Sequence, residues 1–167
     1  MRLYIVRHAI ADPHGTPGIE DDDRDLTEEG IQKMRLSAAG LRSLGYIPEL
    51  LISSPLIRAI RTAEILAEAF GKGVELKISQ ALAPAGNRGD FYREMEQYSK
   101  KLNGLMIVGH QPSLGEIAGE IAWGSPDHFI ELKKGGACAI EVGSVRATPR
   151  GSLISLLTPS ILRRVAD

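Results

Sequence analysis

The segment Met1-Arg-Leu-Tyr-Ile-Val-Arg-His-Ala9 indicates how this chain folds and where its chemistry lies. Residues 3–6 are consecutive apolar or β-favouring residues, which predict a short buried strand. The strand runs directly into Arg7 and His8. In an open α/β sheet, ligands bind just beyond the carboxyl ends of the strands. A cation and an imidazole at that place suggest an anion site, although a surface arginine and a hydrogen-bonded histidine at a strand end would give the same pattern.

The size and composition are those of an ordinary globular domain. The 167 residues are 43% hydrophobic and 25% charged, and the formal net charge is −1. This length suits one well-buried core, so we predict a single domain over residues 1–167. The balanced charge argues against nucleic acid and membrane surfaces as partners. No apolar run reaches the roughly 18 residues of a membrane span and the first residues lack a signal-peptide pattern, so we expect a cytoplasmic protein.

Strand and helix patterns alternate along the chain. Strands are predicted at residues 3–6, 50–52, 74–78, 105–108, 137–142 and 152–157. Helices are predicted at residues 28–44, 55–70, 90–102 and 113–123, with caps at Thr27, Ser54, Asp90 and Ser113. This alternation predicts an α/β fold. We expect a single-domain three-layer α/β/α sandwich, with a mostly parallel sheet and antiparallel strands at one edge.

Two segments stay outside these elements. Residues 10–26 contain prolines, glycines and an acidic run at 20–23, and their length suits a flap. The acidic run lacks the ligand spacing of a calcium loop, so we interpret it as a solvated loop. Residues 124–136 are mixed and glycine-rich, and they are left as a candidate docking surface for a protein partner.

Three predicted strand-to-helix junctions carry unusual polar residues. They deliver Arg7 with His8, then Arg58, then His110 to the same edge of a parallel sheet. Arg58 opens a helix, where a basic residue is unfavourable unless an anion binds beside it. Arg61 lies three residues later and is interpreted as a surface residue.

Two arginines and two histidines at one edge form a pocket suited to phosphate. The planar guanidinium group matches the geometry of phosphate oxygens. Guanidinium charge also lowers the pKa of a nearby imidazole, which leaves a neutral ring nitrogen free as a nucleophile. The second histidine can donate to the phosphoryl oxygens during in-line transfer.

A metal site is the alternative for this edge, with His8, His110 and Asp12 as ligands. Two arginines in the same cleft would oppose a bound dication, so we predict no metal. The single cysteine, Cys138, cannot form an intrachain disulfide or a thiolate cluster for zinc. Its small and apolar neighbours predict a buried packing role.

These motifs resemble those of the histidine phosphatase superfamily, which also contains the phosphoglycerate mutases. Residues 3–8 look like its N-terminal Arg-His signature, and residues 24–30 are similar to its R-x-L-T-x-x-G segment. Residues 53–64 match its S-S-P-x-x-R-A-x-Q-T-A helix start, and residues 108–110 match its second-histidine segment. The four matches occur in the right order.

The resemblance implies a phosphoglycerate mutase-like fold and a phosphatase that needs no metal or organic cofactor. His8 would be the phosphorylated nucleophile, and the phosphate pocket would consist of Arg7, Arg58 and His110. Ala9 departs from the glycine that is usual after the Arg-His pair, a change that we do not expect to remove activity.

The lack of one acidic residue suggests a resemblance to a particular subgroup of the superfamily. Many members carry a glutamate general acid in the loop after the third strand, but residues 81–87 contain no carboxylate. An alkoxide leaving group needs such an acid, which contributes roughly 10²- to 10⁴-fold, whereas an imidazole departs readily when protonated. The short chain and the missing acid resemble the SixA-type phosphohistidine phosphatases. Asp12, Asp90 or the acidic run could still supply a proton.

We therefore expect hydrolysis of phosphohistidine on a phosphotransfer or signalling protein through a covalent phospho-His8 intermediate. The alternative is a small-molecule phosphomonoesterase of the same superfamily, and a third candidate is a non-catalytic phosphate-binding regulatory module. Mutase activity is less favoured, because it needs the missing acid twice. The expected partner is a phosphohistidine-bearing protein or a small phosphate ester. The oligomeric state stays open, and a monomer is compatible with the sequence.

Overall fold

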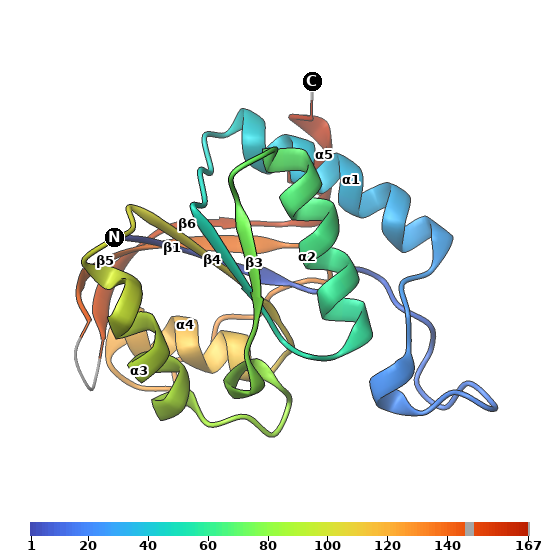
Figure 1. Cartoon of the computed structure of the whole chain (residues 1–167), viewed down its shortest axis with the longest axis horizontal. Helices are drawn as coiled ribbons and strands as arrows, with labels where there is room; N and C mark the ends of the chain where they lie inside the picture. The colour runs from blue at the N-terminus through green and yellow to red at the C-terminus, as the bar shows by residue number, and fades with distance from the viewer. Residues whose placement is uncertain (146–148, 167) are drawn as a thin grey trace.

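A six-stranded mixed sheet forms the centre of the molecule (Figure 1). The computed structural model describes residues 1–145 and 149–166. Its strands are β1 (Arg2–Arg7), β2 (Leu50–Ser53), β3 (Glu75–Ile78), β4 (Gly104–Gly109), β5 (Ala137–Ser144) and β6 (Arg150–Leu157), in the order β3-β2-β4-β1-β5-β6. The first four strands in this order are parallel, and β5 is antiparallel to β1 and β6. The predicted mostly parallel sheet with an antiparallel edge is confirmed.

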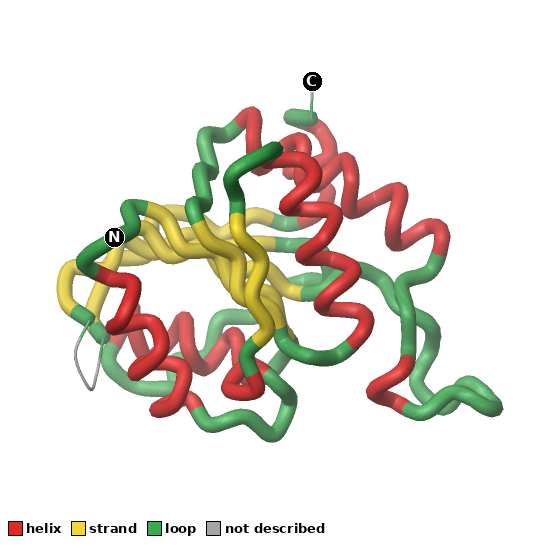
Figure 2. Tube along the Cα trace, viewed as in Figure 1, coloured by secondary structure: helices red, strands yellow, loops and turns green. Residues whose placement is uncertain are grey.

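Helices cover both faces of the sheet, as Figures 1 and 2 show. One face carries α1 (Glu28–Ser43), α2 (Ile57–Phe70) and α5 (Pro159–Arg164). The other carries α3 (Arg88–Ser99) and α4 (Ser113–Trp123). Two short 3-10 helices are η1 (Asp21–Asp23) and η2 (Gln80–Leu82). The predicted three-layer sandwich is confirmed, although α5 was not predicted.

The central strands separate two hydrophobic cores. In β1, Leu3 and Ile5 face the core under α3 and α4, while Tyr4 and Val6 face the core under α1 and α2. All four side chains are at most 3% exposed. Burial on both faces explains why β1 is a continuous apolar run rather than an alternating one. Cys138 is fully buried in β5, as predicted.

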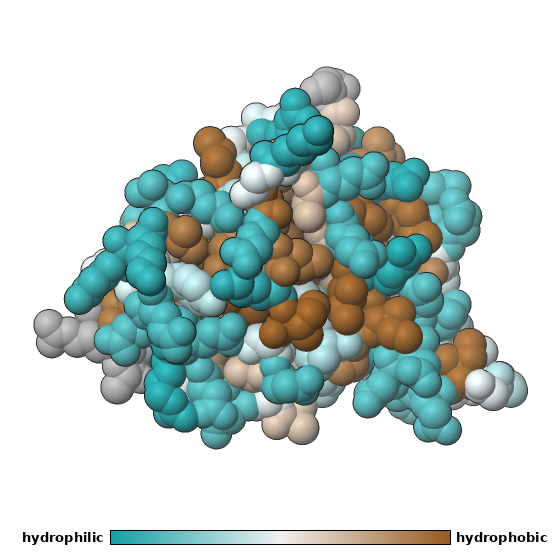
Figure 3. All heavy atoms as spheres, viewed as in Figure 1, coloured by the Kyte–Doolittle hydropathy of each residue, from teal (hydrophilic) through white to brown (hydrophobic). Residues whose placement is uncertain are grey.

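Hydrophilic side chains cover most of the face seen in Figure 3, and apolar atoms show along its middle. Among the described residues, no helix has both the length and the apolar character needed to cross a membrane.

The predicted N-cap residue is confirmed for α1 and is wrong for α2. Thr27 caps α1, because its Oγ1 accepts a hydrogen bond from the Gly30 N–H at 3.0 Å. At α2 the cap residue is Leu56, and its side chain cannot act as a cap. Ser54 was predicted there, but its hydroxyl lies 2.8 Å from a ring nitrogen of His110. This serine serves the pocket rather than the helix.

The predicted caps of the next two helices are also wrong. Asn87 caps α3, because its side chain accepts from the N–H of Asp90, the residue predicted as the cap. Ser113 is already inside α4 and makes no capping-box bond. There the Gln111 side chain accepts from the Gly115 N–H at 2.9 Å and satisfies one of the free donors of the first turn.

The unassigned segment 124–136 lies partly inside the molecule. Ile130 and Leu132 are buried in the core under α4. The N–H of Gly135 donates to the carbonyls of Arg7 and His8, both at 3.1 Å. The segment therefore supports the end of β1, a role that its mixed composition did not indicate.

Gly40 allows α5 to lie directly on α1. A Cβ at this position would lie 2.0 Å from the carbonyl oxygen of Leu162. Helix propensity alone favours alanine over glycine by about 1 kcal/mol. We nevertheless expect Gly40→Ala to lower the free energy of unfolding by about 1–3 kcal/mol, because the helices must separate. Urea unfolding measures this change. Leu36→Ala on the exposed face of α1 is the control, and a stabilised Gly40→Ala protein would contradict the packing.

Candidate active site

The carboxyl ends of β1, β2 and β4 meet at one edge and deliver the predicted residues to it. Arg7 ends β1 and is in register with Gly109 at the end of β4. His8 and His110 therefore follow neighbouring strands, and their ring centroids are 5.1 Å apart. Arg58 lies in the first turn of α2, after β2. The structure brings together the residues that the sequence analysis selected.

The α2 helix is tied to the segment after His8. The backbone N–H of Ala9 donates to the Thr62 hydroxyl at 3.0 Å, and that hydroxyl donates to the carbonyl of Arg58 at 2.7 Å. These bonds fix the start of α2 against the end of β1. Arg58 is thereby held beside the two histidines.

The pocket side chains are deeply buried. Arg58 is 3% exposed, His110 4% and His8 6%, while Arg7 is half-buried. Charged and polar groups are costly to bury unless they find partners. The outer ends of these side chains do find protein partners, and their inner ends do not.

Acceptors of the protein hold the guanidinium ends of both arginines. Arg7 donates from Nη1 to the Leu132 carbonyl at 2.8 Å. Arg58 donates from Nη1 to the carbonyl of Asp21 at 2.6 Å and from Nη2 to its carboxylate at 3.2 Å. These contacts set the orientation of both guanidinium groups.

Three inner nitrogens are buried and unpaired within the described part of the chain. They are Nε of Arg7, Nε of Arg58 and Nδ1 of His110. An unsatisfied buried polar group costs about 1–3 kcal/mol, and more when it is charged. All three belong to side chains that meet at the same edge, so one oxyanion could satisfy them together. This arrangement fits a phosphoryl group.

The hydrogen-bond partner of His8 fixes the position of its ring proton, and His110 faces a hydroxyl that can donate to it. Nδ1 of His8 lies 2.7 Å from the Ala9 carbonyl, which can only accept, so Nδ1 carries the proton and Nε2 keeps a free lone pair. The Ser54 hydroxyl accepts from the Leu56 N–H, and its own proton is available to Nε2 of His110. When this hydroxyl donates to Nε2, the His110 proton sits on Nδ1, where it can donate to an oxyanion.

Both imidazoles are held neutral at physiological pH. Burial, the neighbouring His110 and the charges of Arg58 and Arg7 lower the pKa of His8 to about 3. Burial and the nearby Arg58 lower the pKa of His110 to about 4. For both rings burial is a larger cause than the arginine charges expected from the sequence. Burial also lowers the pKa of both arginines, which remain charged.

Asp21 and Arg24 are pocket residues that the sequence analysis missed. The carboxylate of Asp21 accepts from Nε of Arg24 at 2.9 Å in addition to its bond with Arg58. Arg24 also donates to the carbonyl of Asp12 at 2.7 Å. The interpretation of residues 20–23 as a purely solvated run is therefore wrong for Asp21. In the sequence, Asp21 was one member of an acidic run and Arg24 was the first residue of the R-x-L-T-x-x-G match, and neither pattern indicated a position beside the histidines.

The carboxylates of Asp12 and Asp90, which were considered as proton donors, lie outside this hydrogen-bond network. Asp90 is exposed at the start of α3 and pairs with Arg93. Asp12 is half-buried and contributes its backbone to the flap. Within the described chain, neither carboxylate forms a hydrogen bond or ion pair with the four predicted pocket residues.

Two other sequence interpretations can be compared with the geometry. Arg61 is exposed and pairs with Glu64 and Asp25, as a surface residue would. Across the described residues, no group of three His, Cys, Asp or Glu side chains is arranged to hold a metal ion. The alternative metal site of His8, His110 and Asp12 is not formed.

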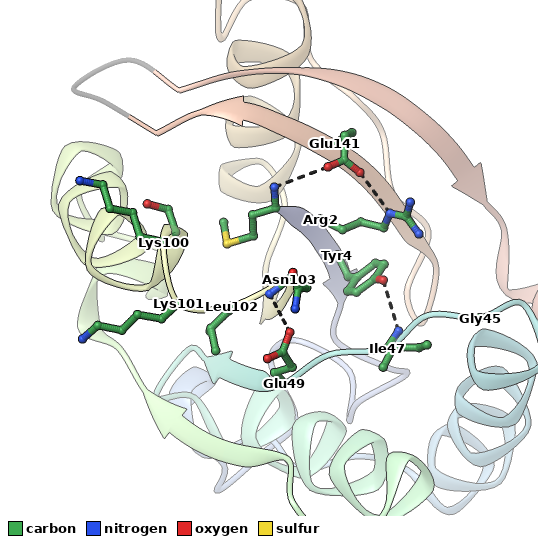
Figure 4. A pocket seen from close by; sticks show the side chains of 12 residues that line it. Arg2, Tyr4, Gly45, Ile47, Glu49, Lys100, Lys101, Leu102, Asn103 and Glu141 are labelled. Carbon is green, nitrogen blue, oxygen red and sulfur yellow. Dashed lines mark hydrogen bonds and ion pairs between the residues drawn. The ribbon is translucent and has the colours of Figure 1, made fainter.

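An open hollow of about 660 Å³ lies at the opposite edge of the sheet, where β1 begins. Figure 4 shows Glu141 between the amino group of Met1 and the guanidinium of Arg2, at 3.5 and 3.3 Å. The Glu49 carboxylate accepts from the Asn103 N–H at 2.6 Å. These polar groups satisfy one another and anchor the start of the chain, and none of the buried unpaired nitrogens found among the described residues lines this hollow.

Because the two histidines are buried and neutral, we predict that the free energy of unfolding depends on pH. In the unfolded chain they protonate near pH 6.5, whereas the folded values are about 3 and 4. The unfolded state therefore binds more protons below pH 6.5, and stability falls as the pH drops from 6.5 toward 4.

We expect wild type to lose about 2–5 kcal/mol more than His8→Asn/His110→Asn between pH 7 and 4.5. Chemical unfolding in phosphate-free buffer measures both pH profiles. Single variants serve as controls and should lie between them. Parallel curves for wild type and the double variant would contradict neutral buried rings.

The contact between the Ser54 hydroxyl and His110 leads to a second prediction, which concerns the affinity of the site for an anion. Without it, the His110 proton is no longer directed to Nδ1, so we expect Ser54→Ala to weaken orthovanadate binding about tenfold, the value of one hydrogen bond to a charged group. Calorimetric titration measures the affinity. Ser54→Thr keeps the hydroxyl and should bind nearly as wild type, whereas equal losses in both variants would indicate a packing effect.

Comparisons with known proteins agree with this geometry. The model of the histidine phosphatase superfamily (branch 1) matches residues 3–85. An uncharacterized protein of Picosynechococcus sp. is 42% identical over 147 residues, which are 87% of this chain and 88% of that protein. Phosphohistidine phosphatase SixA of Escherichia coli K12 is 24% identical over 125 residues, which are 74% of this chain and 76% of that protein.

Solved structures share the whole fold. The protein histidine phosphatase SixA complexed with tungstate matches with a TM-score of 0.82 at 20% identity, over 96% of this chain and 98% of that one. An alpha-ribazole phosphatase from Shigella flexneri matches with a TM-score of 0.68 at 16% identity, over 95% and 97%. The predicted phosphoglycerate mutase-like fold is confirmed. The chain is a phosphatase and belongs to the histidine phosphatase superfamily.

Proposed function

We propose that this phosphatase hydrolyses phosphohistidine on a phosphotransfer or signalling protein. His8 carries the proposal, because its Nε2 has a free lone pair and three unpaired buried donors belong to neighbouring side chains. Nε2 attacks phosphorus, the P–N bond of the substrate breaks, and its electron pair goes to the departing imidazole. Water then attacks phospho-His8, which releases phosphate and restores the free ring.

The other pocket residues bind the phosphoryl oxygens in this scheme. In Arg7 and Arg58 the Nε atom is buried and unpaired within the described residues while Nη1 is held by the protein, so little reorganisation is needed when charge shifts in the transition state. His110 donates from Nδ1. No metal or organic cofactor is part of the proposal.

The choice of phosphohistidine is supported by the leaving group. Residues 81–87 contain no carboxylate, and Asp90 is paired with Arg93 on the surface. An ester needs a proton from a positioned acid, whereas a protonated imidazole leaves without one. The SixA relatives fit the same choice.

A small phosphate ester is the second candidate. It is favoured by the match to an alpha-ribazole phosphatase. A non-catalytic phosphate-binding module is the third candidate. The cytoplasmic location remains a prediction in each case.

Phosphate release by wild type and His8→Ala tests the proposal. Substrates are a protein phosphorylated on histidine and a panel of small esters, with chelator present throughout. We expect wild type to prefer phosphohistidine and His8→Ala to lose at least about 10⁴-fold, since a nucleophile is removed. His128→Ala removes an exposed histidine as the control. Preference for the esters would support the second candidate, and no turnover of either would support the third.

A further inference from the structure

The flap, residues 10–26, places a carboxylate over the buried Arg58. The Asp21 side chain is 42% exposed, whereas that of Arg58 is 4% exposed. The carboxylate therefore lies on the solvent side of the guanidinium group.

Several contacts fix Asp21 in this position. Its backbone carbonyl accepts from Arg58 Nη1 at 2.6 Å, and one carboxylate oxygen accepts from Arg58 Nη2 at 3.2 Å. The other oxygen accepts from Arg24 at 2.8 and 2.9 Å, and lies 3.6 Å from His14. The 3-10 helix η1 begins at this residue. Asp22 and Asp23 are exposed, so Asp21 differs from the rest of the acidic run.

We propose that Asp21 determines specificity: its charge favours a phosphoryl donor with a cationic imidazole leaving group and disfavours one that carries a further anion. The inference rests on the proposed function and names the residue that selects its substrate class. It assigns Asp21 neither a proton transfer nor a covalent step.

The charge of the leaving group explains how the Asp21 carboxylate would affect the reaction. In phosphohistidine, the ring nitrogen that is not phosphorylated can carry a proton, and the ring is then a cation. When the P–N bond breaks, the electron pair goes to the ring nitrogen and a neutral imidazole departs with that proton. A carboxylate beside Arg58 stabilises the protonated ring and repels a substrate carboxylate.

A purely structural clamp on Arg58 would predict a different result. Asp21→Asn keeps one amide oxygen and the backbone carbonyl as acceptors for Arg58, so it removes the charge and the acceptor for Arg24 while the bonds to Arg58 are kept. A lost clamp would lower the turnover of every substrate equally. A lost charge changes the ratio between substrates.

The test compares kcat/KM of wild type, Asp21→Asn and Asp23→Asn. The substrates are a phosphohistidine peptide and a matched pair of esters, glycerol 3-phosphate and 3-phosphoglycerate, of which only the second has a carboxylate. We expect Asp21→Asn to shift the ratio of phosphohistidine to 3-phosphoglycerate about tenfold toward the ester, as one charge near a surface supports. Glycerol 3-phosphate should change less than 3-phosphoglycerate. Asp23→Asn removes the same charge from an exposed site and should keep the wild-type ratio.

The outcomes separate this inference from the proposed function. If wild type hydrolyses the phosphohistidine peptide and Asp21→Asn keeps the wild-type ratio, only the role of Asp21 is overturned. An equal loss on all substrates overturns it in favour of the clamp. If wild type does not hydrolyse the peptide, the proposed function and the inference both fail.

Discussion

The parallel pairing of β1 with β4 is the constraint on which the site depends. Arg7 is in register with Gly109, so the next residues of the two strands carry the two histidines to adjacent positions. Both strands are buried on both faces, and a shift by one residue would exchange the side chains of the two cores. The apolar register that stabilises the sheet therefore also sets the distance between His8 and His110.

The pocket is organised before any phosphate arrives. Its outer atoms are satisfied by parts of the chain distant in sequence: the Leu132 carbonyl holds Arg7, Asp21 holds Arg58, and Ser54 faces His110. The inner nitrogens are left without partners and in a buried environment. Such preorganised donors cost stability in the free protein and lower the reorganisation needed in the transition state. Function and stability are thus opposed at this edge.

The sequence predicted the local features well, because apolar periodicity and strand-to-helix junctions are local signals. It located all six strands and the positions of His8, Arg58 and His110. It failed where a residue serves a distant partner. Ser54 looks like a helix cap, yet it bonds a histidine 56 residues away. Leu132 lies 125 residues from Arg7, and nothing in its segment indicates that contact.

The fold itself is a weak guide to the substrate. Proteins of this fold include a SixA phosphatase and an alpha-ribazole phosphatase, so the sheet edge is common to different leaving groups. The residues that distinguish one substrate from another must therefore contact the leaving group, which lies outside the phosphoryl pocket. In this chain that region is bounded by the flap, whose Asp21 is held by two arginines. Those arginines lower the pKa of the Asp21 carboxyl group and keep it charged at neutral pH. Under the proposal for Asp21, this charge would favour a cationic imidazole over an anionic leaving group, so proteins of one fold would be separated by the charge beside the phosphoryl pocket.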